Sequence, residues 1–164
     1  MQEPITYFLD QSNGTVDLTL TGERFTAKTK GKGLIDKPRS IDIALSDLTN
    51  FCLVPTIGPQ NLVSKGFADY SYDSELIFSY RVGKQIKKKR GVFVNSQNDS
   101  FKILLENLGR ACPSASLMHL EPAEAQKQMG VLSATKAVYI VVSLLLGVPL
   151  VIALALIISK LLSR

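Results

Sequence analysis

Apolar and polar residues alternate along several short stretches of the first hundred residues, which is the period of a half-buried β-strand. In residues 15–20, valine and leucine alternate strictly with aspartate and threonine. Glycine-containing pairs such as Gly22-Glu23 and Gly83-Lys84 separate these stretches and are typical of tight turns between antiparallel strands. The pattern predicts about seven antiparallel strands, at residues 15–20, 24–30, 40–45, 48–54, 66–72, 75–82 and 85–95.

The spacing of apolar residues changes after residue 97 to that of an amphipathic helix. Phe101, Leu104, Leu105 and Leu108 follow the i, i+3, i+4, i+7 pattern, and Asn98 or Asp99 is suited to cap the helix at its start. We expect this helix to run to about residue 110. Small and polar residues then predict a tether over residues 111–135, with one short helix at Pro122–Met129.

A continuous apolar stretch follows the tether. Residues 137–159 carry no charged side chain, and a helix needs about 20 apolar residues to cross a bilayer. We therefore expect a single C-terminal transmembrane helix over residues 136–164, with its core at 137–159. A lone span this close to the C-terminus is typical of a tail anchor, which would leave the soluble domain in the cytosol (N-in) and the C-terminus on the far side. The small residues Ser143 and Gly147 could let two such helices pack into a homodimer.

Composition and charge exclude several classes of protein. The chain is 46% hydrophobic with a net charge of +5, so it is neither disordered nor collagen-like. Lys136, Lys160 and Arg164 flank the apolar stretch and account for three of these charges, which leaves +2 for the remainder. This modest excess, without aromatic residues among the basic ones, argues against nucleic acid as a partner.

The order of strands followed by one helix resembles the pleckstrin-homology (PH) superfold. The resemblance is carried by ALSDLTNFCLVP (44–55) and GVFVNSQNDSFKILLENL (91–108), which look like a strand corner and the last strand entering the closing helix of short bacterial PH-like membrane proteins. It implies a mainly β fold, a bent seven-stranded antiparallel barrel capped by one C-terminal α-helix. On this basis the chain divides into an extension (1–13), a PH-like domain (14–110), the tether (111–135) and the transmembrane helix (136–164).

Residues that could carry catalysis or bind a metal are few. Cys52 and Cys112 form no CxxC pair, His119 is the single histidine, and neither a nucleophile elbow nor a phosphate-binding loop is present. We expect no enzymatic activity, no metal, no cofactor and, in the cytosol, no disulfide.

The strongest polar signal is a basic cluster around Gly83–Gly91. Three explanations of this cluster remain. Its lysines could keep a solvated edge strand from associating with another strand, or the cluster could bind an anionic lipid surface or an acidic partner. The lipid-contact candidates are Arg81, Lys84, Lys87, Lys88, Lys89 and Arg90, and a secondary basic group comprises Lys28, Lys30, Lys32, Lys37 and Arg39. The resemblance adds one restriction, because lipid-binding PH domains carry basic residues around their first loop, where this chain has only Gly22-Glu23.

We therefore expect a membrane-anchored, non-enzymatic adaptor or scaffold that presents a PH-like domain to a protein partner. The partner would bind at an open sheet edge or beside the helix at 101–108. An anionic-lipid-interacting module using residues 84–90, and an accessory subunit of a membrane complex, are the alternatives. The identity of the partner is left open by the sequence.

Overall fold

The fold was obtained as a computed structural model that describes residues 3–11, 14–31, 38–56, 72–83 and 86–131. The chain divides into two compact units, residues 1–125 and 126–164. Of the second unit, residues 126–131 are described, and they end a helix that closes at Gly130, whose φ is 64°.

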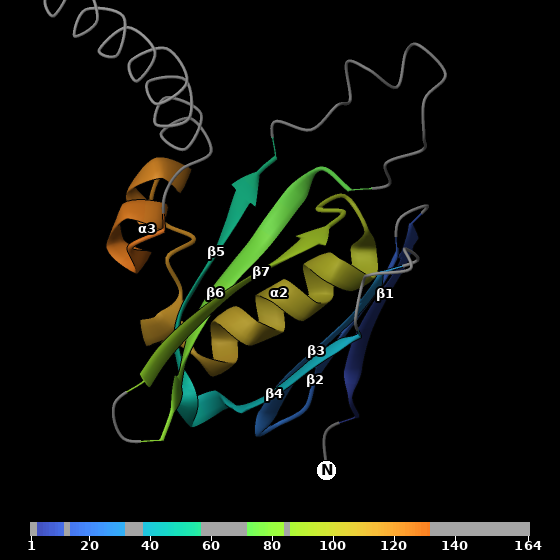
Figure 1. The fold of residues 1–164 in the computed structure, drawn as a ribbon, viewed down its shortest axis with the longest axis horizontal. Coiled ribbons are helices and arrows are strands. Elements are labelled where there is room, and N and C mark those ends of the chain that lie inside the picture. Colours follow the sequence, from blue (N-terminus) through green and yellow to red (C-terminus); the bar gives the residue numbers. More distant parts are fainter. Residues whose placement is uncertain (1–2, 12–13, 32–37, 57–71, 84–85, 132–164) are drawn as a thin grey trace, which may run out of the picture. The chain divides into compact units, whose positions relative to one another are not determined.

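The first unit contains two antiparallel sheets (Figure 1). A 3-10 turn, η1 (Leu45–Asp47), leads from the last strand of the first sheet to the second sheet. The first sheet has the order β1-β2-β3-β4, formed by β1 (Ile5–Gln11), β2 (Gly14–Leu20), β3 (Arg24–Gly31) and β4 (Arg39–Ala44). The second has the order β5-β6-β7, formed by β5 (Leu48–Pro55), β6 (Ser74–Val82) and β7 (Ile86–Val94). They are followed by α2 (Asp99–Ala111), η2 (Pro113–Ala115) and α3 (Pro122–Met129).

Most strands lie where the alternation of the sequence predicts them, but β1 was missed. It falls in the expected N-terminal extension, and it pairs with β2 from Ile5 opposite Leu20 to Gln11 opposite Gly14. The apolar Phe8 obscures its alternation, because this side chain is 62% exposed on the outer face while its neighbours Tyr7 and Leu9 are buried. The strand predicted at 66–72 lies outside the described residues.

The core lies between the sheets, where α2 crosses the space between them (Figure 1). Phe101, Leu104 and Leu108 are fully buried, as their helical spacing predicts, and burying one such side chain contributes about 1.5–3 kcal/mol. The Phe101 ring lies 5.1 Å from that of Tyr7 on β1, so α2 is packed directly against the first sheet.

Polar contacts fix the point at which β7 passes into α2. The Asn95 backbone N–H donates to the Tyr7 hydroxyl (2.8 Å), and the backbone N–H and hydroxyl of Ser96 each donate to the Asp73 carboxylate (2.7 Å). Burial raises the pKa of Asp73, but the bonds from Ser96 outweigh it and leave this pKa below its ordinary value. Asn98 then caps the helix by accepting from the Phe101 N–H.

The chain beyond α2 returns along β5. Ser116 forms a parallel bridge with Phe51, and the Leu117 N–H donates to the Phe51 carbonyl at 2.9 Å. Leu117 is buried, as are Cys52 and Ile77 on the face of the second sheet that points away from the core. The tether expected over residues 111–135 is therefore ordered along part of its length, and the short helix expected at Pro122–Met129 is confirmed as α3.

The expected fold class is wrong in two respects. The predicted bent seven-stranded barrel is corrected to two separate sheets of four and three strands, because no strand pairing joins the sheets within the described residues. The helix expected after the last strand is α2, and α3 is the short helix expected in the tether. The mainly β character agrees with the prediction.

The single transmembrane helix is the second correction. Spanning a bilayer needs about 20 continuous apolar helical residues, and none of the helices in the described parts of the chain is long and apolar enough for this. Residues 137–159, which led to the expectation, lie outside those parts. The tail anchor, the single-pass topology and the membrane location of the domain are therefore not supported.

Two neighbouring residues of α2 test the role of its buried face. Leu104→Ala removes a fully buried side chain and should lower the free energy of unfolding by about 3 kcal/mol. Ile103→Ala is the matched control, because Ile103 is 52% exposed, and it should change stability by less than about 0.5 kcal/mol. Denaturant unfolding measures both, and equal losses would contradict the placement of α2.

Candidate functional site

The basic cluster lies on the hairpin formed by β6 and β7. Val82 pairs with Ile86, and Gly83 at the turn has φ of 66°, a left-handed conformation that glycine adopts without strain. The glycine turn predicted here is therefore confirmed at Gly83. Lys84 lies outside the described residues, and Lys87 is placed on β7 by its backbone alone.

The register of the hairpin distributes its basic residues over both faces. Lys88 pairs with Tyr80 and Arg90 with Phe78, so both occupy the face that carries the buried Val92 and Val94. Lys88 and Arg90 are nevertheless exposed, so the apolar part of this face ends at Val92.

The opposite face of the hairpin carries a second pair of cations. Lys89 pairs with Ser79, and Arg81 is two residues further along β6, so both share the face that points away from the core. Arg81 is exposed and Lys89 is half-buried. Of the candidates predicted from the sequence, the structure thus pairs Lys88 with Arg90 on one face of the hairpin and Arg81 with Lys89 on the other.

The secondary basic group belongs to the other sheet and is interspersed with acidic residues. Lys28 lies opposite Asp17 in the register, and the Arg24 side chain binds the Asp42 carboxylate at 2.9 Å. The hydrogen bond from Arg24 holds the pKa of Asp42 below its ordinary value. Lys28, Lys30 and Arg39 are exposed, whereas Lys32 and Lys37, like the helix-packing candidates Ser143 and Gly147, lie outside the described residues.

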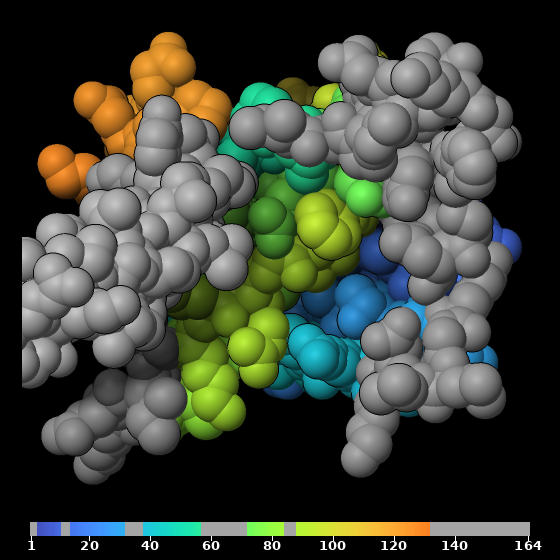
Figure 2. Space-filling model, turned by 45° about the horizontal axis from the view of Figure 1, so that its top comes forward, coloured from blue at the N-terminus to red at the C-terminus, as the bar shows by residue number. Residues whose placement is uncertain are grey.

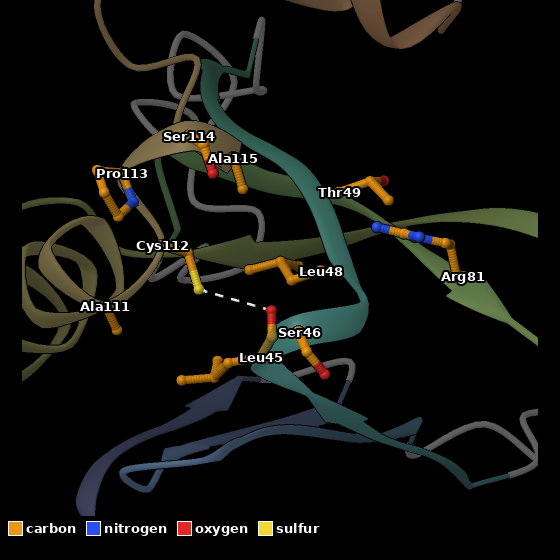
Figure 3. Close-up of a pocket in the computed structure, with 10 residues that line it drawn as sticks. All are labelled: Leu45, Ser46, Leu48, Thr49, Arg81, Ala111, Cys112, Pro113, Ser114 and Ala115. Atoms are coloured by element: carbon orange, nitrogen blue, oxygen red, sulfur yellow. Dashed lines mark hydrogen bonds between the residues drawn. The ribbon is translucent and has the colours of Figure 1, made fainter.

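The two cysteines are buried, and no disulfide joins them. Burial, followed by the charge of Glu75, raises the pKa of Cys52 to about 11, so this residue remains a thiol at neutral pH. The Cys112 thiol donates to the Leu45 carbonyl at 3.7 Å (Figure 3). His119 is exposed, and within the described residues no group of three histidine, cysteine or carboxylate side chains is arranged to hold a metal.

A half-buried carboxylate beside the basic cluster was not foreseen. Glu75 on β6 lies across Gly91 of β7, so a Cβ atom added at Gly91 would overlap the Glu75 side chain. Burial raises the pKa of Glu75 above its ordinary value. The alternation of apolar and polar residues in β6 did not predict the partial burial of Glu75, because in the sequence Glu75 looks like any solvent-facing residue of a strand.

The structure also contains a pocket of about 430 Å³ between η1, β5, β6 and the end of α2 with η2 (Figure 3). Arg81 extends across it from β6 with its guanidinium toward β5, and Thr49 on β5 bonds to Ser79 through its hydroxyl (2.8 Å). Three segments that lie far apart in the sequence form the pocket, so no local motif could have predicted it. Its lining residues are Leu45, Ser46, Leu48, Thr49, Arg81, Ala111, Cys112, Pro113, Ser114 and Ala115.

Comparisons with known proteins add little. No family model and no curated protein matches the chain. Among solved structures, the hSac2 domain from the human phosphoinositide phosphatase Sac2 is similar over 70% of this chain and 71% of that one, with 16% identity and a TM-score of 0.38. A likeness this low says nothing about the activity of this chain, so the proposals below rest on its own residues.

The buried carboxylate gives a pH-dependent prediction. The pKa of Glu75 is higher in the folded than in the unfolded protein. The contribution of Glu75 to the free energy of unfolding is therefore full at low pH, where the carboxyl group is protonated, and it falls as the pH rises through the unfolded and then the folded pKa. Glu75→Gln should therefore be more stable than the wild type at pH 7. This difference in the free energy of unfolding between variant and wild type should vanish at a pH below the ordinary carboxyl pKa. Denaturant unfolding at several pH values measures it. A destabilised variant at pH 7 would indicate that the Glu75 carboxylate has a stabilising partner.

Proposed function

We propose that this domain is a non-catalytic recognition module that binds an extended acidic segment of a protein partner along β7. The observation that carries the proposal is that β7 is an end strand of its sheet among the described residues and presents exposed cations. An extended segment can add to such an edge, with main-chain hydrogen bonds supplying affinity and side chains supplying specificity.

The other sheet edges are less suitable. Ser116 and Leu117 already occupy the β5 edge at Phe51. The end strand β1 is flanked by α2, which contacts it through Phe101. At the β4 edge, Asp42 is paired with Arg24, so this strand offers no excess of positive charge.

The charge of the β7 edge indicates which kind of segment would bind there. Lys88 and Arg90 are exposed, and neither forms an ion pair with another residue of the described chain. Figure 2 shows the yellow-green residues of β7 reaching the surface. Further along the strand, the 44% exposed Phe93 stacks on Tyr72 and offers an apolar contact. Acidic residues opposite the cations and one apolar residue opposite Phe93 would match this surface.

Two further observations support a binding role over a catalytic one. The Cys52 thiol is buried and its pKa is raised, which makes it a poor nucleophile. The functional part of the surface is an edge with long basic side chains, a composition suited to charge recognition. The PH-like resemblance stays a prediction.

A defined peptide tests the proposal. We expect an eight-residue peptide of alternating valine and glutamate to bind the full chain, and the Lys88→Gln, Arg90→Gln double variant to bind it roughly fivefold more weakly, because exposed charge pairs contribute about 0.2–1 kcal/mol each. Binding is measured by NMR titration of the labelled protein at two salt concentrations, and higher salt should weaken it.

The matched control is the Lys28→Gln, Arg39→Gln double variant, which removes the same charge from exposed positions of the first sheet. It should retain wild-type affinity. An equal loss in both variants would mean that net charge alone attracts the peptide. Binding to vesicles containing phosphatidylserine, without binding to the peptide, would overturn the protein-partner proposal in favour of the lipid alternative.

A further inference from the structure

We infer that the pocket lined by Arg81 and Ser114 binds a phosphoryl group, a site separate from the β7 edge. The pocket volume of about 430 Å³ lies within the range of small-molecule sites, about 300–1,000 Å³. Its walls combine apolar side chains from η1 and β5 with polar groups from β6 and the chain after α2. Such a mixture binds the charged end of a ligand at the polar groups and its carbon atoms at the apolar ones.

Arg81 supplies the main anion-binding group. Its guanidinium extends across the pocket, and it forms no hydrogen bond or ion pair with another residue that the structure describes. The planar guanidinium can donate two parallel hydrogen bonds to a phosphate, which makes it well suited to this anion. The hydroxyl groups of Ser46 and Ser114 also line the pocket and form no such bonds within the described chain.

A second cation, Lys89, lies on the same face of the second sheet as Arg81. Lys89 pairs with Ser79, which places it diagonally opposite Arg81 on the adjacent strand. Diagonal neighbours in a sheet are about 7–8 Å apart, a distance that arginine and lysine side chains can bridge around one anion. Two cations and a hydroxyl match the charge and the three oxygens of a phosphoryl group better than they match a carboxylate.

The other polar groups of the pocket lining leave the main role to Arg81, with Lys89 on the same face of the sheet. Thr49 is engaged with Ser79, to whose carbonyl its hydroxyl lies at 2.9 Å. The carboxyl end of α2, at Ala111, carries partial negative charge and so disfavours an anion. Binding therefore depends on the two cations, and removing the nearer one should abolish most of it.

Titration of the full chain with inorganic phosphate, glycerol 3-phosphate and acetate, followed by backbone NMR shifts, tests the inference. We expect saturable shifts around Ser46, Arg81 and Ser114 with phosphate, and affinity for acetate about tenfold lower. Arg81→Gln should weaken phosphate binding about tenfold or more. Lys89→Gln should weaken it by a smaller factor, and the exposed control Arg39→Gln should leave it within twofold of the wild type.

Comparing the three titrations also distinguishes a phosphate ester from free phosphate as the ligand. Tighter binding of glycerol 3-phosphate than of inorganic phosphate would identify a phosphate ester as the ligand, and equal binding would identify the free anion. Equal affinity for acetate and phosphate, an equal loss in Arg81→Gln and Arg39→Gln, or shifts spread over all exposed cations would each overturn the inference. So would the absence of saturable shifts in the pocket.

Discussion

The packing of α2 into the space between the two sheets is the interaction on which the rest of the described fold depends. No strand pairing joins the first sheet to the second among the described residues. The sheets are therefore held together by side chains, and the buried stripe of Phe101, Leu104 and Leu108 contributes to that core from outside both sheets. The apolar side of this helix thereby sets where each sheet can lie.

That constraint reaches the functional surface through the chain itself, because β7 leads directly into α2. The end of β7 is fixed by buried Val94 and by the contacts of Asn95 and Ser96 with Tyr7 and Asp73. Toward its beginning, the described side chains are cations, with Lys88 and Arg90 on one face and Lys89 on the other. Under the proposed function one strand serves two purposes, since its apolar half is held in the core and its basic half would bind the partner. The individual charges are weak, but several of them along one edge would act on the same extended partner.

The sequence predicts the local features well because they depend on neighbouring residues. Strand alternation located β2, β5 and β6, helical spacing located α2 with its Asn98 cap, and Gly83 marked the hairpin turn. It missed β1, whose pairing with β2 is visible only once the register is known. It also missed the burial of Glu75 over Gly91 and the pocket at Arg81, which depend on contacts between segments far apart in the chain. The prediction of a spanning helix relied on apolar length alone, and no helix of the described chain bears it out.

The central claim is that an acidic partner adds to the β7 edge, and amide hydrogen exchange with and without a bound acidic peptide tests it most directly. In an added strand, the main-chain groups that point away from β6 become hydrogen-bonded. The account predicts that alternate amides of β7 exchange more slowly in the complex, while those of β4 and β5 keep their rates. Slowing confined to β4 or β5, or binding without any change in β7, would contradict it.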